Sequence, residues 1–394
     1  MSTAQHTGNL LADGGLFHQF HKRNHEAVVF CSEREVGLRA IIALHDTTLG
    51  PSLGGCRIKQ YTCEQEALTD VLRLSRAMTY KASAGGLNLG GGKSVILLEP
   101  GQEKTPELLT AFAKRVAMLK GTYITAGDVG STTQDLKLMS QFCRHVVGLA
   151  EEDGGLGDSS ILTSLGVFRG LQAAVKTRLG KDDLTGLSVA VQGAGKVGLH
   201  LVEYLLNAGC SVVLADPNAD AVAAAQLQFP AITTCATDDI YDQDVDVFSP
   251  NAIGGLLTES IARRMKAVVV AGGANNPLAS DVAAMVLNDR NILYAPDFVI
   301  NAGGLIMVAS EIEHQSFEQA KARVEEIYDR TLHVFEYAKS HSLLPWEAAR
   351  QIAVNRIVQY RNLTKSLDSQ QLADQCHSVF ESDCQSQQLQ HSRL

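Results

Sequence analysis

Short apolar runs alternate with helical periodicity through the middle of the chain. Five of these runs are rich in apolar residues and have the length of strands: Val189–Val191, Val212–Ala215, Val245–Phe248, Ala267–Ala271 and Ile292–Tyr294. Apolar strands separated by helices favour a parallel sheet that is covered on both faces. From about residue 163 to residue 308 we therefore predict a doubly wound α/β arrangement.

The segment before it mixes strand and helix patterns. Four β-rich runs are predicted to be strands: Ala27–Ser32, Leu38–His45, Ser94–Leu98 and Tyr123–Thr125. Glu64–Lys81 and Thr105–Leu119 carry apolar residues three and four positions apart and are predicted to be helices. We expect a separate α/β unit with a mixed sheet.

Beyond Phe317 the pattern becomes helical and amphipathic, through Arg323–Ser340 and Trp346–Gln359. The polar stretch that starts at about Lys365 is expected to be frayed. Between the first two units, the acidic and glycine-rich segment Glu151–Asp158 has the composition of a hinge.

Composition excludes several classes of protein. The 394 residues suffice for two domains, and a formal net charge of −9 with both signs interspersed argues against a nucleic-acid partner. No apolar run approaches the roughly 20 residues that span a bilayer, and the first residues do not resemble a secretory signal. The eight cysteines contain no C-x-x-C pair, so we expect a cytoplasmic protein without a membrane partner. One group, Cys376, His377, Cys384 and His391, matches no standard zinc spacing, and we expect no metal.

A glycine-rich turn joins two of the predicted strands to a helix. The turn reads Gly193-Ala194-Gly195-Lys196-Val197-Gly198 and fits the pattern G-x-G-x-x-G. Such a turn directs backbone N–H groups and the start of a helix at a pyrophosphate. The alternative is that the glycines serve only a tight strand-to-helix connection.

An acid at the end of the second strand, Asp216, lies where a carboxylate accepts hydrogen bonds from an adenosine ribose. Neither Pro217 nor the three residues after it can neutralise a ribose 2′-phosphate, which Asp216 would repel. We therefore predict NAD rather than NADP as the cofactor.

Three charged residues of the first unit are candidates for chemistry. Lys81 continues the apolar stripe of its helix, so its ammonium is either buried or extends to solvent at the helix end. Lys93 ends a glycine-rich run whose spacing does not fit a P-loop. Asp128 follows a strand, and Thr132 and Thr133 are equally good caps for the next helix. Near a nicotinamide, one lysine can bind a substrate carboxylate, the other can transfer a proton, and the aspartate can orient the reacting nitrogen.

Six motifs occur in order between about residue 27 and residue 359. They are His45–Arg57, Met78–Lys81, Gly90–Lys93, Asp128–Gly130, the Gly193 turn and Tyr294–Gly304. Together they closely resemble the glutamate/leucine/phenylalanine/valine dehydrogenase family, with leucine dehydrogenase as the most similar member. The resemblance implies reversible oxidative deamination of an L-amino acid to a 2-oxo acid and ammonia, with a nicotinamide dinucleotide as the cofactor.

The resemblance also implies a role for each matched residue. Lys81 would bind the substrate α-carboxylate, Lys93 would be the catalytic lysine that activates water, and Asp128 would transfer protons at the amino group. Asn276 and Asn301 would lie near the nicotinamide and the substrate. Beside Lys81 and away from water, the charged form of Lys93 is expected to be disfavoured.

Three parts follow from the resemblance. Residues 1–150 would form a substrate and oligomerisation domain, and residues 151–340 a Rossmann-type NAD-binding domain. Residues 341–394 would be a C-terminal helix and polar tail that return to the first domain. We expect a homo-oligomer, because the first two strands can extend a sheet across a two-fold axis, and relatives form hexamers or octamers.

The matched substrate pocket consists of Leu53, Gly54, Ala126, Leu305 and Val308. Glutamate-specific members carry a lysine where Leu53 stands, and a buried carboxylate without a partner there would be costly. Ala126 favours leucine, valine or isoleucine, because aromatic-specific members tend to have glycine at this position. Leu305 also occurs in some phenylalanine enzymes, so a phenylalanine or tryptophan dehydrogenase is the alternative.

Two residues depart from the family pattern: Asn251 replaces a cysteine, and Gly127 replaces a glutamate beside Asp128. A catalytically silent NAD-binding relative and a 2-hydroxy acid enzyme are further alternatives. The intact lysines and Asp128 argue against the first, and the absence of a histidine in a catalytic context argues against the second.

Overall fold

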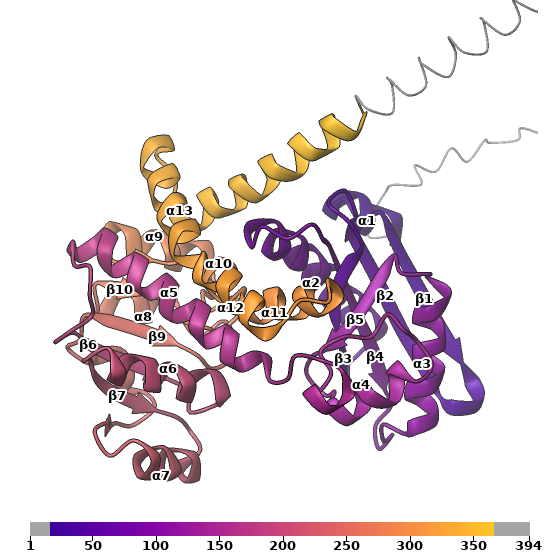
Figure 1. The fold of residues 1–394 in the computed structure, drawn as a ribbon, viewed down its shortest axis with the longest axis horizontal. Coiled ribbons are helices and arrows are strands. Elements are labelled where there is room, and N and C mark those ends of the chain that lie inside the picture. The colour runs from indigo at the N-terminus through magenta and orange to yellow at the C-terminus, as the bar shows by residue number, and fades with distance from the viewer. Residues whose placement is uncertain (1–15, 366–394) are drawn as a thin grey trace, which may run out of the picture.

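Two sheets, one mixed and one parallel, form the framework of the protein (Figure 1). The computed structural model describes residues 16–365. The polar tail after Lys365 and the group from Cys376 to His391 lie outside these residues. Within them no helix is long and apolar enough to cross a membrane, and no three His, Cys, Asp or Glu side chains are placed to hold a metal ion.

The first sheet has five strands in the order β1-β2-β4-β3-β5. They are β1 (Ala27–Glu33), β2 (Leu38–Asp46), β3 (Ser52–Gln60), β4 (Gly90–Leu98) and β5 (Tyr123–Gly127). The pairs β1–β2 and β2–β4 are antiparallel, and β3 runs parallel to both β4 and β5. The predicted mixed sheet is confirmed. The periodicity did not predict β3, however, and β4 begins four residues before the predicted Ser94.

Glycines explain both differences, because they weaken a strand signal while allowing backbones to approach closely. A Cβ on Gly54 would lie 1.8 Å from the Gly92 carbonyl oxygen on β4. A Cβ on Gly91 would lie 2.1 Å from the Thr79 backbone nitrogen. Parallel pairing and helix packing thus fix strands that local propensity does not predict.

Helices cover both faces of this sheet. They are α1 (Leu16–Arg23), α2 (Glu64–Ala84), α3 (Pro106–Met118) and α4 (Thr133–Ser140). One apolar cluster joins α2 to residues of β2 and β4, and another joins α3 and α4 to the opposite face. Thr132 caps α4 in a reciprocal pair with Asp135, so Asp128 is not needed as a cap.

The second sheet is wholly parallel, in the order β11-β10-β9-β6-β7-β8. Its strands are β6 (Ser188–Gln192), β7 (Ser211–Ala215), β8 (Thr233–Thr234), β9 (Val247–Pro250), β10 (Val269–Val270) and β11 (Leu293–Tyr294). Its helices are α5 (Ser159–Leu179), α6 (Lys196–Asn207), α7 (Ala219–Gln228), α8 (Glu259–Arg264) and α9 (Asp281–Asp289). Each of the five predicted apolar runs overlaps a strand, and the Rossmann-like arrangement is confirmed.

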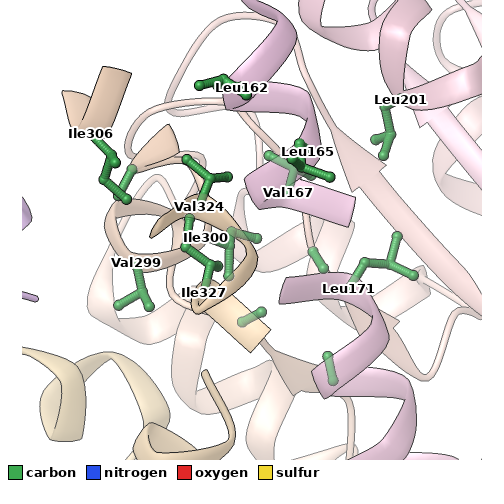
Figure 2. Packing of buried hydrophobic residues seen from close by; sticks show 14 of the residues in the cluster. Leu162, Leu165, Val167, Leu171, Leu201, Val299, Ile300, Ile306, Val324 and Ile327 are labelled. Atoms are coloured by element: carbon green, nitrogen blue, oxygen red, sulfur yellow. The ribbon is translucent and has the colours of Figure 1, made fainter. Parts of the chain in front are cut away.

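The remaining helices lie between the two sheets or lead back to the first (Figure 1). They are α10 (Asp297–Ile300), α11 (Gly303–Ile312), α12 (Phe317–Glu325), α13 (Ile327–His341) and a final helix over residues 345–365. Single 3-10 turns occur at η1 (Arg34–Val36), η2 (Glu151–Asp153) and η3 (Asp239–Asp242). The helices α10–α13 pack on α5 through an apolar core (Figure 2) in which Leu162, Ile300 and Ile327 are buried. A Cβ on Gly170 of α5 would lie 2.2 Å from Ile300, so the glycine allows α10 to approach.

The final helix contacts the first unit, which confirms the expected return of the C-terminal helices. The Arg356 guanidinium donates to the Leu87 carbonyl oxygen at 2.7 Å, and the Ser83 hydroxyl donates to the Ala353 carbonyl oxygen at 2.8 Å. Arg361 pairs with Asp46 at 2.7 Å. The final helix therefore holds the end of α2 and the loop that follows it through polar contacts.

Two histidines in the first unit, His25 and His45, pack edge to face and make stability depend on pH. His45 contacts the Thr79 hydroxyl at 2.8 Å, and His25 contacts the Ser75 hydroxyl at 2.8 Å. Burial lowers the pKa of each histidine to about 4. The unfolded chain takes up these protons near the usual pKa of about 6.5. The contribution of these two histidines to the free energy of unfolding should therefore be constant above about pH 6.5 and fall as the pH drops toward 4.

Urea unfolding at a series of pH values measures this effect. In His45→Gln the fall between pH 6.5 and 4 should be shallower than in the wild type, whatever the stability at pH 7. His314→Gln, at an exposed histidine, should keep the wild-type slope. A wild-type slope in His45→Gln would show that His45 does not carry the dependence.

Candidate active site

The centre of the site is a group of three charged side chains from neighbouring strands. Asp128 follows β5, Lys93 lies on β4 and Arg57 on β3. One Asp128 carboxylate oxygen, Oδ2, lies 3.0 Å from Lys93 Nζ and 2.9 Å from Arg57 Nε. Lys93 is only 6% exposed. The predicted catalytic pair of Lys93 and Asp128 is therefore brought together by the parallel strands.

The electrostatics of this group favour an aspartate anion. Burial alone would raise the pKa of Asp128, but the charges and hydrogen bonds of Lys93 and Arg57 outweigh it and lower the pKa. Arg57 is held from its other side by Asp70 at 2.8 Å. The same contact places the Lys93 ammonium nitrogen against the Asp128 carboxylate, where a proton can pass between them.

Lys81 lies in the last turn of α2 and is partly buried. Burial lowers the pKa of Lys81 to about 8; the Lys93 charge adds to this lowering, and the Asp297 and Asp128 carboxylates oppose it. The ammonium therefore does not behave like one that extends freely to solvent.

A cleft of about 580 Å³ begins at Asp128 and runs between the two units. Ala126 and Val308 line it, together with Lys196 at the start of α6. Leu53 and Leu305 are 1% and 8% exposed and belong to the same apolar core as Ala126 and Val308. Of the four predicted apolar pocket residues, Ala126 and Val308 thus line the cleft and Leu53 and Leu305 lie in the buried core, whereas Gly54 serves the β3–β4 backbone contact.

The glycine-rich turn has the geometry of a tight strand-to-helix connection. Gly193 has a φ of 108°, and a Cβ on Gly198 would lie 2.0 Å from the Gly193 carbonyl oxygen. Gly195 begins α6 and supplies no side-chain cap, and a Cβ there would meet nothing within 4 Å. Open space therefore faces the helix N-terminus, as a phosphate would require.

The acid predicted to bind ribose lies against this turn. Asp216 accepts hydrogen bonds from the backbone N–H groups of Ala194 and Asn218, both at 2.8 Å. Pro217 follows it and is exposed. On the opposite side of the turn, Lys196 Nζ pairs with Asp158 at 2.8 Å, and Val197 packs against the backbone at Gly273.

An asparagine cluster lies where the two units meet. Asn301 is 2% exposed, and its amide nitrogen donates to the Gly273 carbonyl oxygen at 3.1 Å and to Asn275 Oδ1 at 3.0 Å. Its carbonyl oxygen is buried and has no hydrogen-bond partner within residues 16–365. A carboxamide NH₂ such as that of nicotinamide would supply the missing donor. Asn275, one residue before the predicted Asn276, therefore contacts Asn301 through its side chain.

Models of a dehydrogenase family match most of the chain. Residues 25–145 match the model described as "Glu/Leu/Phe/Val dehydrogenase, dimerisation domain". Residues 214–364 match the model described as "Glutamate/Leucine/Phenylalanine/Valine dehydrogenase". Valine dehydrogenase from Streptomyces virginiae is 44% identical over 351 residues, which cover 88% of this chain and 98% of the relative. The chain belongs to the Glu/Leu/Phe/Val dehydrogenase family. It is accordingly an oxidoreductase of the amino acid dehydrogenases.

Two further relatives of this dehydrogenase differ in their named substrates. Leucine dehydrogenase from Geobacillus stearothermophilus is 43% identical over 342 residues, covering 87% of this chain and 93% of the relative. The crystal structure of L-tryptophan dehydrogenase from Nostoc punctiforme superposes with a TM-score of 0.77 at 40% identity, covering 88% of this chain and 99% of that one.

Two charged residues of the dehydrogenase site were not singled out by the sequence. Arg57 ends the His45–Arg57 motif, and Asp297 lies inside the Tyr294–Gly304 motif. Arg57 lies near Asp128, 71 positions away, only because strands distant in sequence pair, and Asp297 lies near the Asn276 backbone, 21 positions away, only in the folded chain. The sequence feature that could have indicated both residues is a charged side chain within a run of glycine and apolar residues.

The two departures from the family pattern have local explanations in this dehydrogenase. The Asn251 side chain accepts from the Gly273 backbone N–H at 2.8 Å and donates to the Ser249 carbonyl oxygen at 3.0 Å, which ties the β9 and β10 ends together. Beside Gly127, the Asp128 backbone N–H donates to the Ser131 hydroxyl at 2.8 Å. That contact and Arg57 hold Asp128 without a neighbouring glutamate.

Proposed function

We propose that this dehydrogenase catalyses the NAD-dependent, reversible oxidative deamination of a branched-chain L-amino acid to the 2-oxo acid and ammonia. The observation that carries the proposal is the buried Lys93–Asp128 pair, because Asp128 also lines a cleft between the two units whose wall includes Ala126 and Val308. The charges of Lys93 and Asp128 both act on Lys81. The names of the valine and leucine relatives support this substrate class.

The proposed roles follow from charge and position. Lys81 is the cation that binds the substrate carboxylate. Asp128, held as an anion by Lys93 and Arg57, accepts a proton from the substrate ammonium group. Lys93 then takes and returns the proton of the water that attacks the imino carbon. The bound dinucleotide supplies the acceptor for the substrate hydride.

The proposed cofactor site consists of the Gly193–Gly198 turn, Asp216 and Pro217, with Asn276 and Asn301 near the nicotinamide. Asp216 supports NAD, because its carboxylate lies against the turn and no described lysine or arginine neutralises it within an ion pair. A 2′-phosphate at this carboxylate would be repelled.

Leu53 and Ala126 support an aliphatic substrate. Leu53 stands where glutamate-specific relatives carry a lysine, and the described lysine that lines the cleft, Lys196, is paired with Asp158; both facts disfavour glutamate. The second candidate is an aromatic amino acid, which the resemblance to the tryptophan dehydrogenase structure favours. Pocket differences of one methylene change binding by about 1–3 kcal/mol, so the two substrate classes can overlap.

A parallel assay tests the proposal. NADH formation by the purified protein is measured at alkaline pH with L-leucine, L-valine, L-phenylalanine, L-tryptophan and L-glutamate, using NAD and then NADP. Fastest turnover of leucine or valine with NAD is expected. Faster turnover of an aromatic amino acid would support the second candidate. NAD binding without turnover of any substrate would contradict a catalytic role.

The substitution Ala126→Gly should shift the preference toward aromatic substrates. Removal of the methyl group from the cleft wall makes room for a ring and reduces contact with leucine. The ratio of kcat/KM for phenylalanine to that for leucine should rise by about tenfold. Ala236→Gly, at a loop residue that does not line the cleft, should leave the ratio unchanged. An unchanged ratio in Ala126→Gly would remove Ala126 from the specificity determinants.

We also propose that the protein is a homo-oligomer that associates through β1. This strand is at an edge of the first sheet, and Phe30 on it is 55% exposed. The unpaired edge can continue a sheet into a second copy, and the matched N-terminal model is described as a dimerisation domain.

A further inference from the structure

The carboxylate of Asp297, at the start of α10, acts on two parts of the site: the asparagine cluster and Lys81. Its Oδ1 accepts from the Tyr294 hydroxyl at 2.9 Å, and its Oδ2 accepts from the Asn276 backbone N–H at 2.7 Å. Tyr294 is itself 6% exposed. Two directed donors therefore fix the carboxylate in place.

The bond to Asn276 acts on the asparagine cluster. Asn276 has a φ of 49°, in the left-handed region that asparagine adopts more readily than most residues with a side chain. Asn275, the preceding residue, accepts the amide of Asn301 through its side-chain oxygen. Asp297 thus holds the backbone turn that presents Asn275 to Asn301.

The same carboxylate acts on Lys81 across the boundary between the two units. Helix α10 contacts α2, and a Cβ on Gly85 at the α2 end would lie 3.6 Å from the Ala302 Cβ. Three charged groups face Lys81: Lys93 from β4, Asp128 after β5 and Asp297 from α10. Of the two carboxylates, Asp128 is already paired with Lys93 and Arg57.

We propose that Asp297 is a positioning residue that keeps Lys81 charged for the substrate carboxylate and holds the asparagine turn beside it. This inference rests on the proposed role of Lys81 in binding the substrate. Its physical basis is that a carboxylate fixed by two hydrogen bonds lies at the start of a helix that contacts α2, the helix whose last turn holds Lys81. The charge of this carboxylate opposes the loss of the Lys81 proton that burial promotes. Without that carboxylate, Lys81 would lose its proton at lower pH, and a neutral amine binds a carboxylate weakly.

The substitution Asp297→Asn keeps the size of the side chain and removes its charge. The alkaline limb of kcat/KM for the amino acid should move to lower pH by about one unit, and KM on that limb should rise by about tenfold. The change in kcat should be much smaller than the change in KM. Asp297→Glu should restore the wild-type limb, and Asp281→Asn, at an exposed residue of α9, should leave it unmoved.

Tyr294→Phe separates positioning from a general structural role. It removes one hydrogen bond to Asp297 and keeps the charge, so the alkaline limb should stay close to that of the wild type. If Asp297→Asn and Tyr294→Phe lower Tm alike and neither moves the limb, Asp297 is only structural and the proposal is wrong.

A titration that does not depend on turnover keeps the test independent of the proposed function. Lysines of the intact protein are ¹³C-methylated, the Lys81 signal is identified with Lys81→Arg, and its NMR shift is followed with pH. The midpoint of the Lys81 titration should be lower in Asp297→Asn than in the wild type. If Asp297→Asn does not fold, Asp297→Ser should show the same lowering. An unchanged midpoint overturns the inference, whereas a wild type without amino acid turnover contradicts only the proposed function.

Discussion

Replacing Lys93 with alanine should reduce the kcat of amino acid oxidation by about 10²–10⁴-fold, the range that positioned acid–base groups contribute. The substitution removes the only lysine that Asp128 contacts within residues 16–365. Asp128 remains paired with Arg57 at 2.9 Å, so the carboxylate should stay in place. Loss of the proton carrier, rather than collapse of the site, is therefore the expected cause. Steady-state NADH formation over a range of pH measures the effect.

A matched control is Lys59→Ala on the same sheet, where the lysine side chain is 39% exposed and its pairing with Glu66 is at the surface. This variant should retain wild-type kcat. NAD binding, followed by the change in protein fluorescence, should be retained in both variants. A Lys93→Ala enzyme with near wild-type kcat and an unchanged pH–rate profile would contradict the catalytic role of Lys93.

Replacing Gly54 with alanine should destabilise the protein by about 3 kcal/mol, at the upper end of the usual cost of overpacking. The added Cβ would lie 1.8 Å from the Gly92 carbonyl oxygen, and backbone atoms of a paired strand cannot move aside as a flexible side chain can. The β3–β4 pairing that places Arg57 beside Lys93 would have to shift, so activity should fall as well. Urea unfolding of the two proteins at pH 7 measures the loss.

Gly127→Ala provides the comparison on β5. A Cβ there would lie 3.4 Å from Leu136 Cδ1 and 3.6 Å from the Ser131 hydroxyl oxygen, both on side chains that can adjust. Its unfolding midpoint should stay close to the wild-type value. If the two alanine variants unfolded at the same urea concentration, close β3–β4 contact would not be the reason for glycine at position 54.

Local sequence patterns were enough to predict those parts of the structure that depend on residues close together in the chain. The apolar runs of the second unit became parallel strands, because a strand buried on both faces must be apolar throughout. The glycine turn and Asp216 lie together because one strand, one turn and one helix place them there. The same holds for the α4 cap at Thr132.

Local patterns failed where glycine and long-range pairing decide. The segment Ser52–Gln60 has a weak strand signal, yet it pairs with two parallel neighbours through bonds that only the folded sheet supplies. The periodicity also gave no sign that the Asn275 side chain contacts Asn301, or that the Asn276 backbone N–H donates to the Asp297 carboxylate. Such a bond spans 21 positions and leaves no periodic trace in the sequence.

The sequence by itself determined the family, the fold class and the candidates Lys81, Lys93 and Asp128, because motifs and periodicity are properties of neighbouring residues. Only the tertiary structure decided the charges around them. It paired Asp128 with Lys93 and Arg57, and it placed Asp297 where it opposes the loss of the Lys81 proton. Electrostatic interactions depend on distance in space and on burial, and neither quantity is specified until strands and helices far apart in the chain have packed together.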